Sequence, residues 1–209
     1  DPISEDFWNW NSSPFCSPFH AMEDDRSNPW ITHSTRQVYE NPWISVSENK
    51  VTNPGGGPGI YGVVHFKNRA IGVIPVDEEG NTWLVGQFRY TLGAFEWEIP
   101  EGGCPEEEAP ADAAKRALRE ETGILAGRLE VLFDNVALSN SVSVERSTIF
   151  LATELSFSTP EPEESEQLEV RKLPPKEAVD LVNRGAITDS MSVMALLKVA
   201  LDLNLDLSR

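Results

Sequence analysis

The stretch that decides the fold is GGCPEEEAPADAAKRALREETGI, which occupies residues 102–124. Paired glycines at its start permit turn conformations that other residues resist. The prolines and acidic residues that follow favour a helix start, where proline is tolerated and negative charge meets the positive end of the helix dipole. Residues 109–121 are rich in Ala, Leu, Arg and Glu and predict the helix itself, and Gly123 predicts its end.

Residues 117, 120 and 121 share one face of this expected helix, because residues three and four apart are neighbours. Glu120 and Glu121 place carboxylates on that face, whereas residue 117 is alanine. Carboxylates are hard oxygen ligands that suit magnesium beside a diphosphate. The alternative is an ordinary solvated helix face, on which Arg116 and Glu120 form a simple ion pair.

The spacing resembles the Nudix box, the signature of hydrolases that cleave a nucleoside diphosphate linked to another group. The family pattern is G-x5-E-x7-R-E-U-x-E-E-x-G-U, where U is a bulky aliphatic residue. The chain matches it at Gly102, Glu108, Arg116, Leu118, Glu120, Glu121, Gly123 and Ile124. It departs at Ala117, where the family has a metal-binding glutamate. Three explanations stay open: Glu108, Glu145 or a water fills the gap, the chain is slow or silent, or residue 117 is not the natural one.

Further stretches resemble the branch of this family that acts on ADP-ribose and nucleotide sugars. They are residues 87–89, 97–102, 145–147, 169–178, 185–189 and 195–197. The resemblance covers roughly residues 36–200. It implies an α/β fold, namely a Nudix-type α/β/α sandwich with a mixed β-sheet. It also implies a homodimer and metal-dependent hydrolysis, with Mg²⁺ or Mn²⁺, of ADP-ribose or another nucleoside diphosphate sugar to a nucleoside monophosphate and a sugar phosphate.

Carried over residue by residue, the resemblance assigns the metal to Glu120 and Glu121, with the backbone carbonyl of Glu101 as a further ligand. The catalytic residues it implies are Glu121, Glu145 and Arg116, among which Glu145 acts as the general base or orients the attacking water. Metal ions would neutralise the diphosphate and lower the pKa of that water.

The resemblance also implies three substrate-binding residues, and each has a structural alternative. Arg89 would hold the diphosphate or the terminal sugar, because a guanidinium matches phosphate oxygens in a fork; alternatively it is a partner for Glu96. Glu98 would accept hydrogen bonds from sugar hydroxyls, or be an exposed strand residue. Trp43 would stack on a base across the dimer interface, or be part of the dimer core.

The chain divides by composition into three expected segments. Residues 1–35 form an arm rich in aromatics and prolines, in which proline density argues against regular structure. It is expected to pack on the domain or on a second subunit, the alternative being a disordered leader. Residues 36–59 hold strands that we expect to form the dimer, and residues 60–209 form the Nudix catalytic domain.

Alternation and apolar runs locate the regular elements within these segments. Strands are expected at residues 38–39, 43–47, 50–52, 61–66, 70–76, 82–89, 95–101, 129–138, 147–156 and 167–172. Helices besides the one in the box are expected at residues 175–184 and 190–202. The acidic segment 159–166 is typical of disorder.

Composition limits the partners and the compartment. The net charge of −17 argues against a nucleic-acid backbone or an anionic membrane as partner. The two cysteines, Cys16 and Cys104, indicate no disulfide framework, so a cytoplasmic location is expected. No apolar run approaches the ~20 residues that span a bilayer, and no secretion leader is visible.

Two rival functions stay open. A Nudix fold that senses a nucleotide sugar without cleaving it is favoured by Ala117, whereas Glu121 and Glu145 favour an enzyme. A purely structural protein with a vestigial box is favoured only by the aromatic arm.

Overall fold

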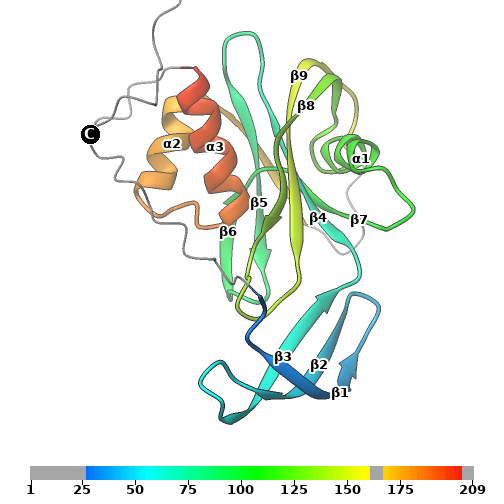
Figure 1. Ribbon diagram of the computed structural model, residues 1–209. Coiled ribbons are helices and arrows are strands. Elements are labelled where there is room, and N and C mark those ends of the chain that lie inside the picture. The colour runs from blue at the N-terminus through cyan, green and yellow to red at the C-terminus, as the bar shows by residue number, and fades with distance from the viewer. Residues whose placement is uncertain (1–26, 161–166, 204–209) are drawn as a thin grey trace, which may run out of the picture.

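The computed structural model describes residues 27–160 and 167–203 of the chain. The aromatic residues of the arm other than Trp30, and most of the acidic segment, therefore lie outside the described residues. Figure 1 shows a layered body and, below it, a small sheet from the N-terminal part of the chain. No helix of the described residues is long and apolar enough to cross a membrane.

The small sheet is antiparallel, with the order β1-β2-β3. Its strands are β1 (Ile31–Glu40), β2 (Ile44–Thr52) and β3 (Pro58–Phe66). The expected turn between the first two strands is confirmed, because Asn41 Oδ1 accepts hydrogen bonds from the backbone N–H groups of Trp43 and Ile44 at 2.9 and 2.7 Å. Irregular structure in residues 31–35 is a wrong expectation, since β1 begins at Ile31, and β2 is one strand rather than two.

The body holds two further sheets. One has the order β7-β4-β9-β8, in which β4 is parallel to β9 and the pairs β4–β7 and β8–β9 are antiparallel, so the predicted mixed sheet is confirmed. The other has the order β10-β5-β6. The strands are β4 (Arg69–Pro75), β5 (Thr82–Arg89), β6 (Ala94–Glu98), β7 (Glu101–Cys104), β8 (Ile124–Ala137), β9 (Arg146–Phe157) and β10 (Glu169–Leu173).

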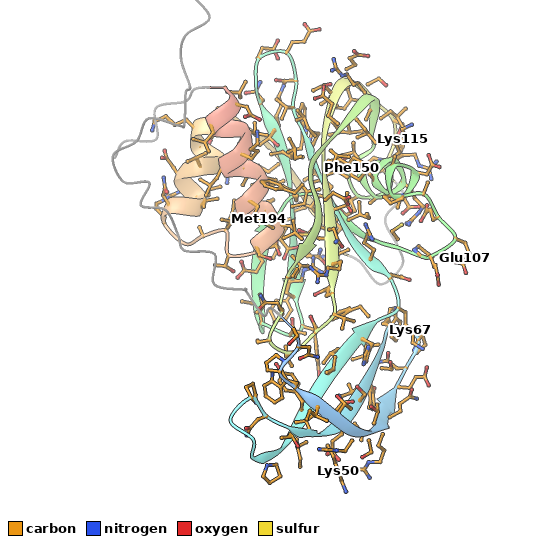
Figure 2. All side chains as sticks on the ribbon, viewed as in Figure 1. Lys50, Lys67, Glu107, Lys115, Phe150 and Met194 are labelled. Carbon is orange, nitrogen blue, oxygen red and sulfur yellow. The ribbon has the colours of Figure 1, made fainter. Side chains whose placement is uncertain are left out.

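Helices cover the body from both sides. Helix α1 (Pro110–Thr122) lies on one side, and α2 (Pro175–Asn183) and α3 (Ser190–Asp202) lie on the other (Figure 1). Strand β4 contributes side chains to both hydrophobic cores, because side chains alternate between the two faces of a strand. Ile71 and Val73 pack in the cluster below α1, and Ile74 packs in the cluster below α3. Figure 2 shows Phe150 in the first layer and Met194 in the second. The predicted α/β/α sandwich is confirmed.

The strand expected at residues 95–101 is divided in two, and the chain changes sheet at Pro100. Strand β6 pairs with β5, and β7 pairs with β4. Proline has no N–H to donate to a ladder. Around it, the Pro100 carbonyl accepts from Val73 N–H at 2.8 Å, and Ile99 N–H donates to Ser192 Oγ at 2.8 Å.

Candidate active site

Helix α1 forms as the box predicts. Pro110 stands in its first turn, where a missing N–H costs nothing. Gly123 ends it with φ 72°, a left-handed conformation that glycine adopts at low cost, and donates its N–H to the Arg119 carbonyl at 2.8 Å. The face turned to the sheet carries Ala117 and Glu121, one turn apart.

Arg116 ties the two ends of the box together. Its guanidinium donates to both carboxylate oxygens of Glu108 at 3.0 and 2.7 Å, and to the Gly103 carbonyl at 2.8 Å. It also donates to Glu120 at 3.3 Å, which is the ion pair considered as the alternative reading of this face. The hydrogen bonds that Arg116 donates to Glu108 lower the pKa of the Glu108 carboxyl group. Arg116 therefore holds the loop before α1 and one oxygen of Glu120.

Glu121 is a buried carboxylate at the end of the same helix. Its side-chain oxygen accepts a hydrogen bond from the backbone N–H of Glu101 at 3.0 Å. Residue 117 is also buried, and a Cβ added to Gly102 would lie 2.9 Å from the Ala117 Cβ. The box glycine thus lets α1 approach β7 closely enough for Glu121 to reach the strand.

Arg89 and Glu98 form a two-pronged ion pair beside this carboxylate. Arg89 Nε lies 2.9 and 3.0 Å from the two Glu98 oxygens, and its Nη2 donates to Glu98 as well. The Arg89 pKa is raised, first by hydrogen bonding to Glu98 and also by the charges of Glu101 and Glu121. Glu98 is only 5% exposed, so it is not an exposed strand residue. Its carboxylate binds Arg89, so the partner of Arg89 is Glu98 and not Glu96.

Glu145 and Asp189 add two further carboxylates to the group. Burial raises the pKa of Glu145, and the nearby Asp189 carboxylate raises it further. The pKa of Glu101 is raised well above its ordinary value, first by burial and then by Asp189. Asp189 caps α3, because its side chain accepts from Ser192 N–H at 2.7 Å. Sequence reasoning missed Asp189 as a site residue, although an aspartate directly before an apolar helix is a cap signal.

The chemistry of this group fits a divalent cation. Within the described residues no three Asp, Glu, His or Cys side chains are already gathered to hold a metal ion. However, Glu101 Oε1 is buried without a hydrogen-bond partner, and it lies among carboxylates that repel one another. Hard oxygen donors of this kind are the ligands that Mg²⁺ and Mn²⁺ prefer.

The structure thus brings together most of the residues named from the sequence. Arg89 pairs with Glu98 and lies 3.8 Å from a Glu101 oxygen, and Glu121 accepts from the Glu101 N–H. Asp189 raises the pKa of both Glu101 and Glu145. Arg116 and Glu120 are half-buried on α1 and form an ion pair with each other. Trp43 lies in the β1–β2 turn of the small sheet, with 69% of its surface exposed.

Comparisons with known proteins identify the family of the chain. The NUDIX domain description matches residues 66–192, and the nucleoside diphosphate sugar hydrolase N-terminal domain matches residues 30–64. An ADP-ribose pyrophosphatase of Mycobacterium tuberculosis is 33% identical over 172 residues, which cover 80% of this chain and 82% of the relative. One of Bacillus subtilis is 30% identical, over 79% of this chain and 89% of the relative.

A solved structure described as an ADP compounds hydrolase has the same fold, with a TM-score of 0.75, 20% sequence identity, and coverage of 84% of this chain and 94% of that one. The chain belongs to the Nudix family and is a Nudix hydrolase. Members of this family generally need a divalent metal.

Proposed function

We propose that this Nudix hydrolase cleaves the diphosphate bond of ADP-ribose or another nucleoside diphosphate sugar, giving a nucleoside monophosphate and a sugar phosphate. Glu121 is the observation that carries the proposal, because the box places its buried carboxylate 3.0 Å from the Glu101 N–H and beside Arg89. Relatives named ADP-ribose pyrophosphatase support the substrate class.

The metal ligands we propose are Glu120, Glu121 and the backbone carbonyl of Glu101, for Mg²⁺ or Mn²⁺. These residues would hold the cation, which would supply neutralisation of diphosphate charge and a lowered pKa of water. Arg116 donates to one Glu120 oxygen at 3.3 Å and Arg119 Nη2 lies 3.8 Å from the other, so a cation bound here would share the carboxylate with these guanidinium groups.

The remaining residues bind substrate and move a proton. Arg89 presents the free edge of its guanidinium to the diphosphate, while Glu98 fixes its orientation. Glu145 takes the proton from the attacking water, and its raised pKa suits a base. Water oxygen bonds to one phosphorus as the bridging P–O bond breaks, and the bridging oxygen leaves with the other phosphate.

We further propose that the chain is a homodimer joined through the small sheet. All ten residues of β1 are exposed, and so are large apolar side chains such as Tyr39, Trp43 and Ile60. A three-stranded sheet needs a packed face for stability, and a second copy supplies one. Trp43 would then stack on the base of the substrate bound by the partner. The absence of nucleic-acid and membrane partners and the cytoplasmic location stay predictions.

A hydrolysis screen tests the proposal. The purified protein is given ADP-ribose, ADP-, UDP- and GDP-sugars and dinucleotides with Mg²⁺ or Mn²⁺, and monophosphate products are measured by chromatography. We expect turnover of at least one nucleoside diphosphate sugar that stops when the metal is chelated. Turnover of none of them, with both metals present, contradicts the proposal.

A binding module that senses a nucleotide sugar is the second candidate, and Ala117 is the observation that favours it. Its buried methyl group leaves the ligand face of α1 without the third carboxylate of the family pattern. The variant Ala117→Glu separates the two functions. A sensor binds one nucleotide sugar tightly and leaves it intact in both proteins, whereas a slowed enzyme shows turnover that increases in the variant.

A further inference from the structure

The loop that carries Glu145 is attached to the small sheet rather than packed into the body. Residues 138–145 connect β8 to β9, and Figure 1 shows this connection at the lower end of the body, next to the small sheet. Strand β3 runs alongside the loop, as a parallel bridge between Val64 and Ser143 records. The loop therefore receives its position from an element outside the Nudix sandwich.

Hydrogen bonds make this attachment. Val64 N–H donates to the Val142 carbonyl at 2.8 Å, and Val144 N–H donates to the Val64 carbonyl at 3.1 Å. The Tyr61 hydroxyl donates to the Ser141 carbonyl at 2.8 Å. The last of the bonded loop residues, Val144, directly precedes Glu145.

Packing contributes little to holding the loop. Leu138, at the start of the loop, packs against the core below α3, but the other apolar side chains, Val142 and Val144, are 47% and 50% exposed. Most of the remaining loop residues are serine or asparagine. A polar loop with few buried apolar contacts opens easily. The hydrogen bonds from β3, together with those inside the loop such as Glu145 N–H to Ser143 Oγ at 3.4 Å, therefore limit the motion of Glu145.

Tyr61 is itself held in place on the sheet. Its ring meets Trp30 edge-on, with centroids 5.2 Å apart, and its backbone carbonyl accepts from Asn49 Nδ2 at 3.1 Å. The ring is therefore held in place while its hydroxyl donates to the Ser141 carbonyl. Loss of the hydroxyl alone removes one tie and leaves the ring contact in place.

We propose that Tyr61 is a positioning residue for hydrolysis: from the small sheet it fixes the loop that places Glu145 at the diphosphate. The inference rests on the proposed function, in which Glu145 is the general base. With Tyr61 in this role, the small sheet contributes to the active site of its own chain, in addition to any role as a dimer interface.

The test compares Tyr61→Phe with a matched control, Tyr39→Phe. Tyr39 lies on the same sheet, and its hydroxyl accepts only a 3.3 Å bond from Asn41 within its own hairpin among the described contacts. We expect Tyr61→Phe to lower kcat for the preferred substrate roughly 3–10-fold with KM within about twofold, because misplacing a base reduces reactive geometry. Both variants should melt within about 2 °C of the wild type, because each loses one exposed hydrogen bond.

Hydrogen exchange of the substrate-free protein supplies a second readout that does not depend on turnover. Peptides covering residues 139–145 should exchange faster in Tyr61→Phe than in the wild type and in Tyr39→Phe. Equal kcat and equal exchange in the two variants overturn the proposal, as does faster exchange without any loss of kcat. A wild-type protein that hydrolyses no nucleotide sugar defeats the proposed function instead, while the exchange comparison still shows whether Tyr61 holds the loop.

Discussion

Arg89 should serve both the fold and the substrate, and a double-variant comparison separates these roles. Replacing Arg89 with alanine leaves the Glu98 carboxylate, 5% exposed, without the guanidinium that binds it. Removing one partner of a fully buried ion pair typically costs about 3–5 kcal/mol. Since the Arg89 side chain is 36% exposed, solvent screens part of the loss, and we expect about 2–3 kcal/mol.

A second replacement, Glu98→Gln, removes the stranded charge. The double variant should regain about 1–2 kcal/mol of unfolding free energy, because an amide is less costly to bury than an unpaired carboxylate. It should not regain activity, because the diphosphate still lacks its guanidinium. Urea unfolding measures the first effect, and kcat/KM for the preferred nucleotide sugar measures the second.

Either of two results would refute this reasoning. A cost of less than about 0.5 kcal/mol for Arg89→Ala would mean that the pair contributes nothing measurable, as many exposed pairs do. Recovery of kcat/KM in the double variant would mean that Arg89 acts only by neutralising Glu98. Arg89→Lys serves as the control, since it keeps the charge and loses the fork.

Three other perturbations have expected outcomes. Asp189→Ala should lower the unfolding free energy by about 1 kcal/mol through the lost cap of α3, and Asp189→Asn should retain it; equal melting temperatures of the two variants would contradict the capping role. Gly123→Ala should cost about 2 kcal/mol or more in urea unfolding, because φ is 72° and the new Cβ would lie 2.3 Å from the Ser158 carbonyl; a stable variant would show that the helix end relaxes. Burial alone would raise the pKa of Asp77, but hydrogen bonds from Lys172 and Asn81 lower it to about 2, from 3.8. Because the pKa of Asp77 is lower in the folded state, its ionised carboxylate stabilises the fold above pH 3.8, and this stabilisation is lost as the pH falls toward 2. Asp77→Ala should therefore cost about 1–2 kcal/mol of unfolding free energy at pH 7 and progressively less below pH 3.8. A cost that does not change with pH would exclude the ionised carboxylate as its source.

Local sequence signals were sufficient for the box helix and for most strands. The helix at residues 110–122 has its proline start, its glycine end and its small apolar face all within the box, so no distant contact is needed to specify it. Strand β5 and helix α3 follow the expected boundaries for the same reason. Glu121, which the family pattern names, accepts a hydrogen bond from the Glu101 backbone N–H, and its role as a metal ligand stays a prediction.

What the sequence did not predict depends on contacts between distant segments. The division of β6 from β7 is completed by the bond from Ile99 to Ser192, which are far apart in the chain. The partner of Arg89 is Glu98 rather than Glu96, although the β5–β6 register sets Glu96 opposite Gln87 and Glu98 opposite Val85, further along the ladder from Arg89. Asp189 joins the site only after α3 has packed on the sheet. Periodicity carries no information on such pairings.

The most direct test of the proposal that Glu121 binds a divalent cation replaces one oxygen of its buried carboxylate. Glu121→Gln keeps an oxygen that accepts the Glu101 N–H and removes the negative charge that a divalent cation requires. We predict that this variant folds as the wild type does, binds Mn²⁺ measurably more weakly by calorimetry, and releases nucleoside monophosphate from a nucleotide sugar roughly 100-fold more slowly or worse. Unchanged Mn²⁺ affinity together with wild-type turnover would contradict the account.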